Sequence, residues 1–489
     1  MLHPINRTSA LRDLQSFLEQ KNQTAGFCYL RGRRRVGKST LLTQFEKAHP
    51  GQVFYFMGRL DEKSTQSLKR CAESWDSFTG KTELSRLKSG HLSWDEFFKA
   101  VTAFSSILNR PVLLAFDEIQ WIAREKSGFL GALKEHWLNL EPMKNIRIVL
   151  CGSSNKFFRQ MTGGEEKLIR GLKTRADIWL RPLNLSEIKS HYKLKYTDEE
   201  LLLAYMFFGG IPYYWNQIEP TLFFTQGINR SCFTPSSIFL EEFSEMLSLE
   251  FQKNSIKTLS QIFSQFKGTG VTAAQIAEKA RLAPSTVGDL LEKLENYSLV
   301  SRKTPLFSKP KEIQRGSLYY CRDFYLNFYF RILSKYKTKI SRNRESEMLF
   351  ATLLQTSSNS LYLPDYTGPM FEILLQHILE SSEERHEPIF QKLNLEQVTF
   401  DVGFHWDKST QFDLILHNAS DRVYRFIECK WTRDAKQILD CITSFSRRIE
   451  PYEIPIQKVI CLNHTPSDSL RAAAKKHDVT LITPTDLIG

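Results

Sequence analysis

The stretch Gly32-Arg-Arg-Arg-Val-Gly-Lys-Ser-Thr40 decides the fold of the N-terminal part, because it fits the pattern G-x-x-x-x-G-K-[ST] of a phosphate-binding loop. An apolar run at 27–30 predicts a buried strand before it, and residues 41–46 predict a helix after it. Glycines let backbone N–H groups crowd around a phosphate, and the helix N-terminus adds partial positive charge. We expect Lys38 to reach the β and γ phosphates and Ser39 to offer its hydroxyl to Mg²⁺. The predicted nucleotide-binding residues are Gly32, Arg33, Arg34, Arg35, Val36, Gly37, Lys38, Ser39 and Thr40.

A second motif, Pro111-Val-Leu-Leu-Ala-Phe-Asp-Glu118, places two acids after five apolar residues. This is the Walker B pattern, and a buried strand would deliver Asp117 to the sheet edge where open α/β sheets keep their ligands. We expect Asp117 to hold Mg²⁺, directly or through water, and Glu118 to polarise the attacking water. Such a run is common by itself, but it is informative when it follows a P-loop.

Two further nucleotide-contacting sites are predicted, and for each there is an alternative in which the residues have only a structural or surface role. The strand at 145–152 is followed by Ser153-Ser154-Asn155, any of which could sense the γ-phosphate, with Ser153 and Asn155 favoured; the alternative is a helix cap. Arg170 or Arg175 would stabilise charge on the phosphoryl group in a neighbouring subunit; the alternative is a surface arginine.

Length and composition limit the classes of protein. At 489 residues the chain is too long for one core, and about 150 residues per domain suggests three or four domains. No apolar run approaches the ~20 residues of a membrane span, and Met1–Arg7 lacks the apolar core of a secretory signal. The eight cysteines include no C-x-x-C pair, so we expect reduced, buried thiols in a cytoplasmic protein.

The net charge of +12 is concentrated in one segment. From Ser301 to Arg344 there are twelve Lys or Arg and two acids, which favours nucleic acid, and DNA in particular, as a partner. Helical patterns at 256–266, 272–281 and 285–296, then a return strand at 317–322, predict a winged helix-turn-helix. The helix that would enter the major groove, 285–295, is net acidic. DNA binding by this module and packing within the protein therefore remain equal alternatives.

Residues 323–330 form a dense aromatic pattern that is typical of a buried core helix; an aromatic platform for bases is the alternative.

The last 125 residues carry a second set of charged groups. Glu372 lies near the start of a predicted helix, Asp413 lies in a strand, and Glu428 and Lys430 end the next strand. A short loop joins the two strands, so a hairpin brings both carboxylates together, and Glu428 and Lys430 share a face. Two carboxylates and a lysine can bind Mg²⁺ or Mn²⁺ and activate water, as in the PD-(D/E)xK endonuclease fold. Glu372, Asp413 and Glu428 are the predicted metal ligands, and Asp413, Glu428 and Lys430 the catalytic set. The alternative is an ordinary sheet in which these charged residues occur by chance and form no site.

The whole chain resembles the prokaryotic archaeal-type ATPase family, which is close to AAA+ and STAND proteins. The resemblance is carried by the P-loop, by Phe116-Asp-Glu-Ile-Gln-Trp121, by Cys151-Gly-Ser153 and by Gly209-Gly-Ile-Pro212. The C-terminal part resembles that family's usual partner, a restriction-endonuclease-like domain of unknown function. The matching residues are Tyr320-x-x-Asp323-x-x-Leu326-x-Phe328, Phe371-Glu372, Val402-Gly403, Asp413 and Glu428-Cys-Lys-Trp431. The order Arg170-Gly171 departs from the family's usual Gly-Arg pair and leaves the arginine finger unassigned.

These observations predict a multidomain α/β protein with four parts. They are a P-loop ATPase core with a parallel sheet (1–183), a helical lid (184–250), a winged helix with a basic and aromatic connector (251–345) and a PD-(D/E)xK nuclease-like domain (346–489). The predicted function is an ATP-hydrolysing switch, coupled to a metal-dependent nuclease-like domain in DNA processing or defence. We expect a homo-oligomer or a nucleotide-dependent assembly. The alternatives are an ATP-dependent regulatory or scaffolding protein that does not cleave, and a winged-helix DNA-binding regulator.

Overall fold

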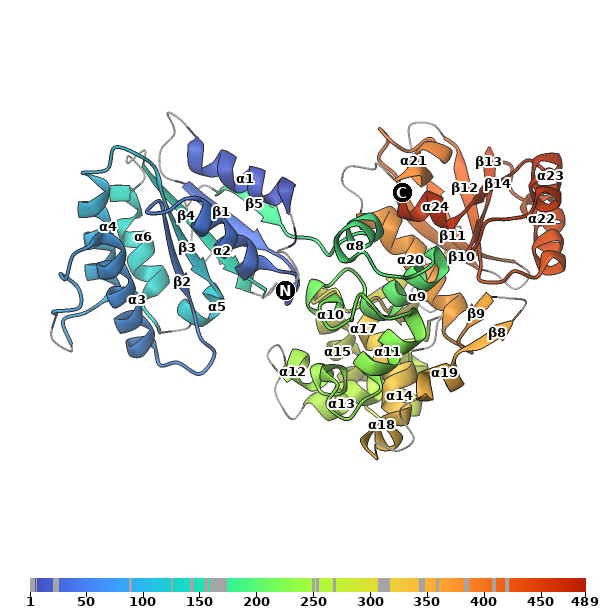
Figure 1. The fold of residues 1–489 in the computed structure, drawn as a ribbon, viewed down its shortest axis with the longest axis horizontal. Coiled ribbons are helices and arrows are strands. Elements are labelled where there is room, and N and C mark those ends of the chain that lie inside the picture. The colour runs from blue at the N-terminus through green and yellow to red at the C-terminus, as the bar shows by residue number, and fades with distance from the viewer. Residues whose placement is uncertain are drawn as a thin grey trace. The chain divides into compact units, whose positions relative to one another are not determined.

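A computed structural model describes most of the chain: residues 5, 7–20, 26–87, 90–124, 126–140, 145–153, 157–158, 174–248, 251, 255–266, 270–306, 317–342, 348–357, 360–381, 387–406, 410–417 and 422–489. These residues fall into two units, 1–182 and 183–489. Figure 1 labels their helices and strands. Within the described part, no helix is both long and apolar enough to span a membrane.

The first unit is built on a parallel sheet in the order β2-β3-β4-β1-β5. Its strands are β1 (Gly26–Arg31), β2 (Val53–Met57), β3 (Val112–Asp117), β4 (Ile146–Gly152) and β5 (Thr174–Trp179). Its main helices are α1 (Thr8–Glu19), α2 (Lys38–Ala48), α3 (Ser64–Thr79), α4 (Trp94–Ser105), α5 (Ile119–Ile122) and α6 (Phe129–Leu140). Continuous apolar strands are buried on both faces, which is what a parallel sheet requires.

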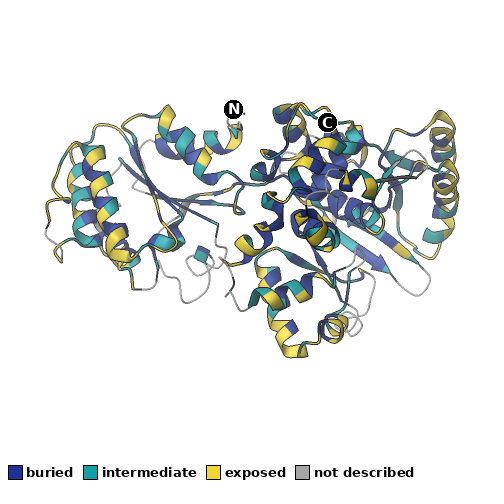
Figure 2. Ribbon diagram, turned by 60° about the horizontal axis from the view of Figure 1, so that its bottom comes forward, coloured by how far each residue is buried: buried dark blue, intermediate teal, exposed yellow. Residues whose placement is uncertain are grey.

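Each face of this sheet has its own hydrophobic core. On β1, Phe27 and Tyr29 pack with α3, α4 and α6, whereas Cys28 and Leu30 pack with α1 and α2. The alternation follows from the two-residue period of a strand. Figure 2 shows buried strands between helices that expose their outer faces. The predicted P-loop sheet is therefore present.

The second unit begins with a set of short helices. They are α8 (Leu185–Tyr192), α9 (Asp198–Phe208), α10 (Pro212–Trp215), α11 (Phe224–Cys232), a 3₁₀ turn (Ile238–Leu240) and α12 (Glu242–Ser248). Glycine is required at position 210, because a Cβ atom there would lie 1.9 Å from the carbonyl oxygen of Leu183. The predicted helical content of 184–250 agrees with these elements.

Three helices and a two-stranded antiparallel ribbon follow. They are α13 (Ser255–Phe263), α14 (Ala273–Ala280), α15 (Pro284–Asn296), β6 (Val300–Lys303) and β7 (Leu318–Cys321). The aromatic segment then forms α17 (Phe324–Phe328), a π-helical turn (Tyr329–Leu333) and α18 (Ser334–Ser341). Its aromatic side chains are buried, so the prediction of a core helix is confirmed and an exposed base platform is wrong. Residues 307–316 and 343–347, which hold four of the twelve basic side chains counted above, lie outside the described residues.

The C-terminal residues form a mixed sheet in the order β10-β11-β12-β13-β14. The strands are β10 (Asp401–Trp406), β11 (Gln411–His417), β12 (Tyr424–Lys430), β13 (Ile456–Leu462) and β14 (Val479–Ile482). The helices around it are α20 (Thr367–Ser381), α21 (Pro388–Lys392), α22 (Ala435–Ile449), α23 (Asp468–Lys476) and α24 (Pro484–Ile488); α19 (Leu349–Leu353) and a small ribbon, β8 (Gln355–Ser357) and β9 (Ser360–Tyr362), precede them. Apart from the short α21, the order along the chain is a helix, three strands, a helix and a strand.

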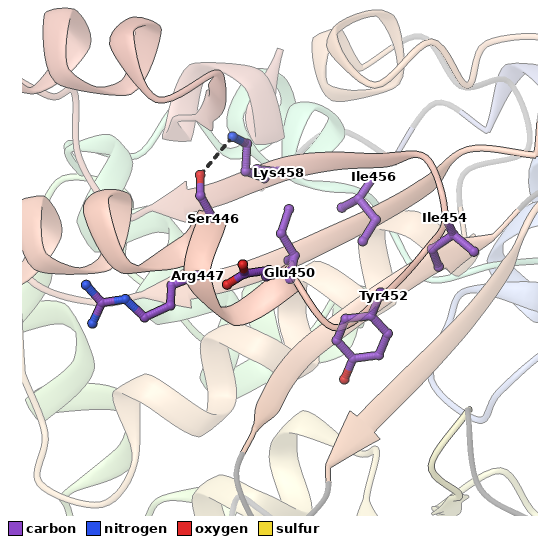
Figure 3. Close-up of a pocket in the computed structure, with 8 residues that line it drawn as sticks. Ser446, Arg447, Glu450, Tyr452, Ile454, Ile456 and Lys458 are labelled. Atoms are coloured by element: carbon purple, nitrogen blue, oxygen red, sulfur yellow. Dashed lines mark hydrogen bonds between the residues drawn. The ribbon is translucent and has the colours of Figure 1, made fainter.

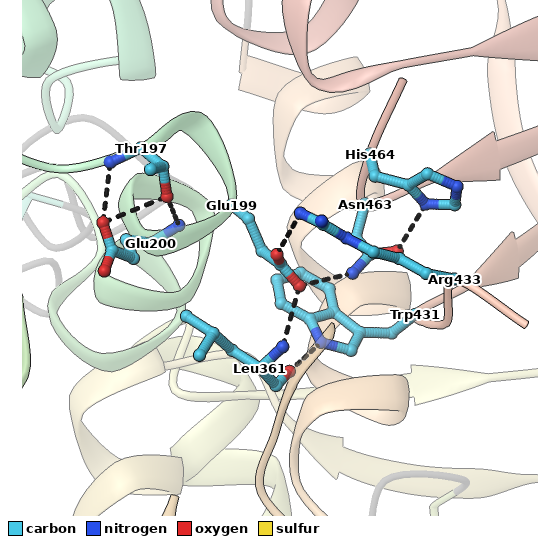
Figure 4. A network of polar contacts seen from close by, with 8 residues as sticks. All are labelled: Thr197, Glu199, Glu200, Leu361, Trp431, Arg433, Asn463 and His464. Atoms are coloured by element: carbon cyan, nitrogen blue, oxygen red, sulfur yellow. Dashed lines mark hydrogen bonds and ion pairs between the residues drawn. The ribbon is translucent and has the colours of Figure 1, made fainter. Parts of the chain in front are cut away.

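A buried carboxylate joins α9 to the C-terminal residues (Figure 4). Glu199 is 6% exposed, and its Oε1 accepts hydrogen bonds from the backbone N–H of Leu361 at 3.0 Å and from Asn463 at 2.8 Å. Its Oε2 pairs with Arg433 at 2.6 Å. The indole of Trp431 donates to the Leu361 carbonyl at 2.5 Å. Segments more than 160 residues apart are thus held by one side chain.

We expect Glu199→Ala to destabilise the second unit by about 2–3 kcal/mol, because it leaves buried donors without an acceptor. Its sequence neighbour Glu200 only caps α9 through Thr197, and Glu200→Ala should cost about 1 kcal/mol at most. Denaturant unfolding followed by tryptophan fluorescence measures both. Equal losses in the two variants would contradict a structural role specific to Glu199.

Candidate functional sites

The loop between β1 and α2 has the backbone of a phosphate cradle. Gly37 adopts φ 102° and a Cβ atom there would meet nothing within 4 Å, so the loop faces open space at this point. A Cβ atom on Gly32 would lie 2.4 Å from the Leu180 carbonyl oxygen, which explains that glycine. Lys38 begins α2 and is 5% exposed; its Nζ donates to the carbonyls of Gly32 at 2.8 Å and Arg33 at 3.0 Å. Burial lowers the pKa of Lys38. These residues fit a nucleotide phosphate, which would offer Lys38 charged oxygens in place of carbonyls.

The acid at the end of β3 is fully buried and held by a tyrosine. One oxygen of Asp117 accepts from the Tyr55 hydroxyl at 2.9 Å, and the other from the backbone N–H of Glu118 at 2.8 Å. Burial and the charge of Asp117 raise the pKa of Tyr55, and the Ser39 hydroxyl of the loop opposes that rise. Tyr55 therefore lies near both side chains expected to serve Mg²⁺.

Glu118 sits in a left-handed backbone conformation, with φ 49°, at the turn from β3 into α5. Its carboxylate accepts a hydrogen bond from the side-chain amide of Gln120. Burial and the adjacent Asp117 charge raise the pKa of Glu118, which brings this carboxylate closer to the range suited to a general base.

Strand order brings these groups to one edge of the sheet. β4 lies between β1 and β3, and Gly152 at its end pairs with Arg31 just before the loop. Ser153 therefore follows directly between the loop and the acids. Asn155 and Arg170 lie outside the described residues, and Arg175 lies in β5 on the other side of β1.

The second set of charged groups lies in the C-terminal sheet. β11 and β12 pair antiparallel, with Leu414 opposite Ile427. One residue further along the two strands lie Asp413 and Glu428. The register with β10 shifts between Gly403 and His405, which places an extra β11 residue at a bulge next to Asp413. Asp413 accepts from the backbone N–H of Cys429 at 2.8 Å. The hairpin brings the two carboxylates together as the sequence predicts.

Glu428 is bound by two cations of the chain itself. One oxygen pairs with Lys430 at 2.9 Å, which puts both side chains on one strand face, and the other pairs with Arg448 of α22 at 2.5 Å. Glu428 is 4% exposed. Burial lowers the pKa of Lys430, but the charges of Glu428 and Asp413 outweigh it and raise that pKa.

Glu372 of α20 and Lys303 of β6 complete this cluster. Burial and the Asp413 charge raise the pKa of Glu372 to about 8; burial and the Glu428 charge raise that of Asp413 to about 6. The charge of Lys303 opposes both shifts. Lys303 belongs to the basic segment from Ser301 to Arg344 that favours nucleic acid, but it is only 5% exposed, and the charges of these carboxylates oppose the lowering of its pKa by burial.

The carboxylates, as arranged, do not fit the predicted metal site. Glu428 has both oxygens paired with cations, and one oxygen of Asp413 takes a backbone N–H. Throughout the described ranges, no three His, Cys, Asp or Glu side chains are grouped so that they could hold a metal ion. In this arrangement Glu372, Asp413 and Glu428 therefore do not form the predicted metal site.

An open pocket lies apart from the carboxylate cluster, at the end of α22 (Figure 3). Ser446, Arg447 and Glu450 line it from the helix side, and Ile454, Ile456 and Lys458 from the strand side. Lys458 donates to Ser446 at 3.1 Å. Its lining lacks the carboxylate pair on which the predicted chemistry depends.

Sequence reasoning did not identify four of the residues at these sites: Tyr55, Gln120, Lys303 and Arg448. Tyr55, Lys303 and Arg448 come from elements distant in the sequence, whereas Gln120 lies only two residues after its partner Glu118. In the sequence the four residues appear only as polar or charged residues within otherwise apolar patterns.

Comparisons with known proteins agree with the first site. Residues 5–218 match a family described as an ATPase domain predominantly from Archaea, and residues 329–440 match one described as "Archaea bacterial proteins of unknown function". An uncharacterized protein of Methanocaldococcus jannaschii is 22% identical over 440 residues, 89% of this chain and 90% of that protein.

Two solved structures match this chain at low identity. A Walker-type ATPase of Pyrococcus abyssi is 18% identical with a TM-score of 0.47, covering 67% of this chain and 96% of its own. The ORC2 protein of Aeropyrum pernix, in ADPNP–ADP complexes, is 12% identical with a TM-score of 0.43, covering 70% and 97%. The family match supports an ATP-binding P-loop ATPase of the archaeal type.

We expect Tyr55→Phe to raise the Mg²⁺ concentration for half-maximal ATP hydrolysis roughly fivefold, because Asp117 loses a hydrogen bond worth about 1 kcal/mol. Binding of a fluorescent ATP analogue without Mg²⁺ should change little. The measurement is phosphate release across a Mg²⁺ titration. An unchanged Mg²⁺ requirement in a folded variant would show that Tyr55 does not position Asp117.

Proposed function

We propose that this protein is an ATP-hydrolysing switch coupled to a nuclease-like C-terminal domain that acts on nucleic acid, with DNA favoured. The single observation that carries the ATPase is the meeting of Lys38, Asp117 and Glu118 at one sheet edge, with the family match beside it. Bound Mg²⁺ would supply charge neutralisation on the phosphates, held through Ser39 and Asp117. Glu118 would orient the attacking water and accept its proton.

The nuclease-like proposal rests on the C-terminal hairpin. It delivers Asp413, Glu428 and Lys430 together, in an element order that suits a PD-(D/E)xK fold. Mg²⁺ or Mn²⁺ would supply water activation there, provided that Glu428 exchanges a cation of the chain for the metal. DNA processing or defence would suit control of such a site by nucleotide.

Further parts of the proposal concern assembly and DNA contact. The helices α13 to α15 with the ribbon β6–β7 suit a winged helix-turn-helix. Asp289 and Glu292 are exposed on α15, which weighs against major-groove contact by that helix. Ser153 and Asn155 would sense the nucleotide, and Arg170 or Arg175 would act across a homo-oligomer or a nucleotide-dependent assembly.

A second candidate is an ATP-dependent regulatory or scaffolding protein that binds DNA or protein without cleavage. The two cations on Glu428 favour it, since a carboxylate neutralised in this way is not free for a metal. Cleavage assays separate the two candidates.

Lys38→Ala should lower ATP turnover roughly 100-fold or more, because the variant loses the cation that stabilises the transferred phosphoryl group. Lys47→Ala, which removes an exposed lysine from the same helix, should leave turnover unchanged. Steady-state phosphate release measures both. Turnover that survives in Lys38→Ala would refute the assignment of the loop.

Asp413→Asn and Lys430→Ala should abolish Mg²⁺- or Mn²⁺-dependent cleavage of DNA while ATP turnover persists. Asparagine keeps an acceptor for the Cys429 N–H, so the fold around the hairpin is spared. Lys436→Ala, an exposed lysine at the start of α22, is the matched control. If the wild type cuts neither DNA nor RNA with ATP and either metal, the scaffold candidate replaces the nuclease.

A further inference from the structure

Gln120 lies two residues after Glu118 and contacts its carboxylate. The side-chain amide of Gln120 donates a hydrogen bond to Glu118 Oε2. Among the described residues, no other group donates to this carboxylate, so the direction in which it points depends on one amide. Turning the amide over would set its oxygen against the carboxylate, so the nitrogen belongs on this side.

The turn that carries both residues is fixed by the core of the first unit. Glu118 precedes α5 with φ 49°, and the backbone N–H of Trp121 donates to its carbonyl at 2.8 Å. Ile119 and Ile122, on either side of Gln120, are buried with the residues of the neighbouring helices and strands. Since these neighbours anchor α5, the backbone holds Gln120 close to the carboxylate.

The far side of the Gln120 amide lies against Gly152, the last residue of β4. A Cβ atom on Gly152 would lie 2.5 Å from Gln120 Oε1. Side-chain atoms of Ile119 and Phe158 would lie 3.3 Å from the same Cβ position. The amide therefore occupies space that glycine leaves open. Because β4 lies between β3 and β1, the contact with Gly152 places this amide at the sheet edge that carries the P-loop and the two acids.

Stability does not explain this placement of the amide. Gln120 Oε1 is buried, and none of the residues that the structure describes offers it a hydrogen bond. A buried acceptor without a partner costs stability, and an apolar side chain of similar length would avoid that cost. Residues that depart from such rules are most often found at functional sites. The amide is therefore best explained by what its nitrogen does for Glu118.

We propose that Gln120 is a positioning residue for ATP hydrolysis: its amide holds the Glu118 carboxylate toward the attacking water, and Gly152 provides the room for that amide. The inference rests on the proposed role of Glu118 as the base and names residues that act through it. With Oε2 held by the amide, Oε1 accepts the proton of water while the water oxygen bonds to the γ-phosphorus and the bond from that phosphorus to ADP breaks. Gln120 does not touch the reacting atoms.

The test is ATP hydrolysis by the full chain, measured as phosphate release across an ATP titration. Gln120→Met keeps a side chain of similar length without the donor, and Gly152→Ala displaces the amide but leaves it in the chain. Each should lower kcat roughly tenfold or more, with KM for ATP within about twofold of the wild type, because a misplaced base slows the chemical step and leaves nucleotide binding intact. Gln15→Met, which removes an exposed amide–carboxylate hydrogen bond from α1, is the matched control and should leave kcat unchanged.

A double-mutant cycle with Glu118→Gln separates positioning from a general structural effect. In single-turnover hydrolysis, Gln120→Met should cause no further loss once Glu118 has been replaced. An equal loss in both backgrounds, or wild-type kcat in a folded Gln120→Met variant, overturns the inference. If Gln120→Met does not fold, Gly152→Ala is judged by the same two criteria.

The same measurements keep the inference apart from the proposed role of Glu118. Turnover that persists in Glu118→Gln refutes the proposed base and the inference with it. A loss of turnover in Glu118→Gln beside wild-type kcat in Gln120→Met refutes the inference alone.

Discussion

A charge removed from water must be met by an opposite charge or by hydrogen bonds, and both units are organised by this constraint. In the first unit, Lys38 is met by carbonyls of its own loop, and Asp117 by a phenol and an amide. In the second, Glu199 collects donors from three distant segments. Buried ionic groups fix which segments meet, because few other arrangements leave them satisfied.

The two candidate sites satisfy their charges differently, and this difference bears on function. The partners of Lys38 are neutral carbonyls, which a phosphate can replace with a gain in electrostatic energy. The partners of Glu428 are the cations of Lys430 and Arg448, and a metal can replace them only if both side chains find other partners. The first site is therefore arranged to accept its ligand, whereas the second must rearrange first.

Local, fixed spacing is what made parts of this protein predictable. The P-loop, Asp117 and Glu118 follow one another along the chain, and the parallel sheet brings them together once its strands are recognised. The pairing of Asp413 with Glu428 was predictable too, because a short loop leaves a hairpin little choice. Lys303 and Arg448 were not, since each reaches the cluster from another element, and a charge in a sequence does not reveal whether water or a carboxylate surrounds it. The role of Tyr55 was not predictable either, because the sequence Val53–Met57 does not show whether a tyrosine only packs in the core or also donates a hydrogen bond to a carboxylate.

Control of the C-terminal site is a question of differential binding. A ligand moves a two-state equilibrium only by the difference between its affinities for the two states, and a change from 1:99 to 99:1 takes about 5.5 kcal/mol. Glu199 ties α9 to Arg433, three residues beyond Lys430, so movement of α9 is resisted by the strand end that carries the carboxylate–lysine pair. The ribbon has no such buried carboxylate of its own in the contacts described. It is held to α20 by the Tyr320–Gln376 hydrogen bond and the part-exposed Arg322–Glu380 ion pair, and such contacts are individually weak. The ribbon and α9 are therefore held to the C-terminal residues by contacts of different kinds: α9 by a buried ion pair with Arg433, and the ribbon by hydrogen bonds and a part-exposed ion pair.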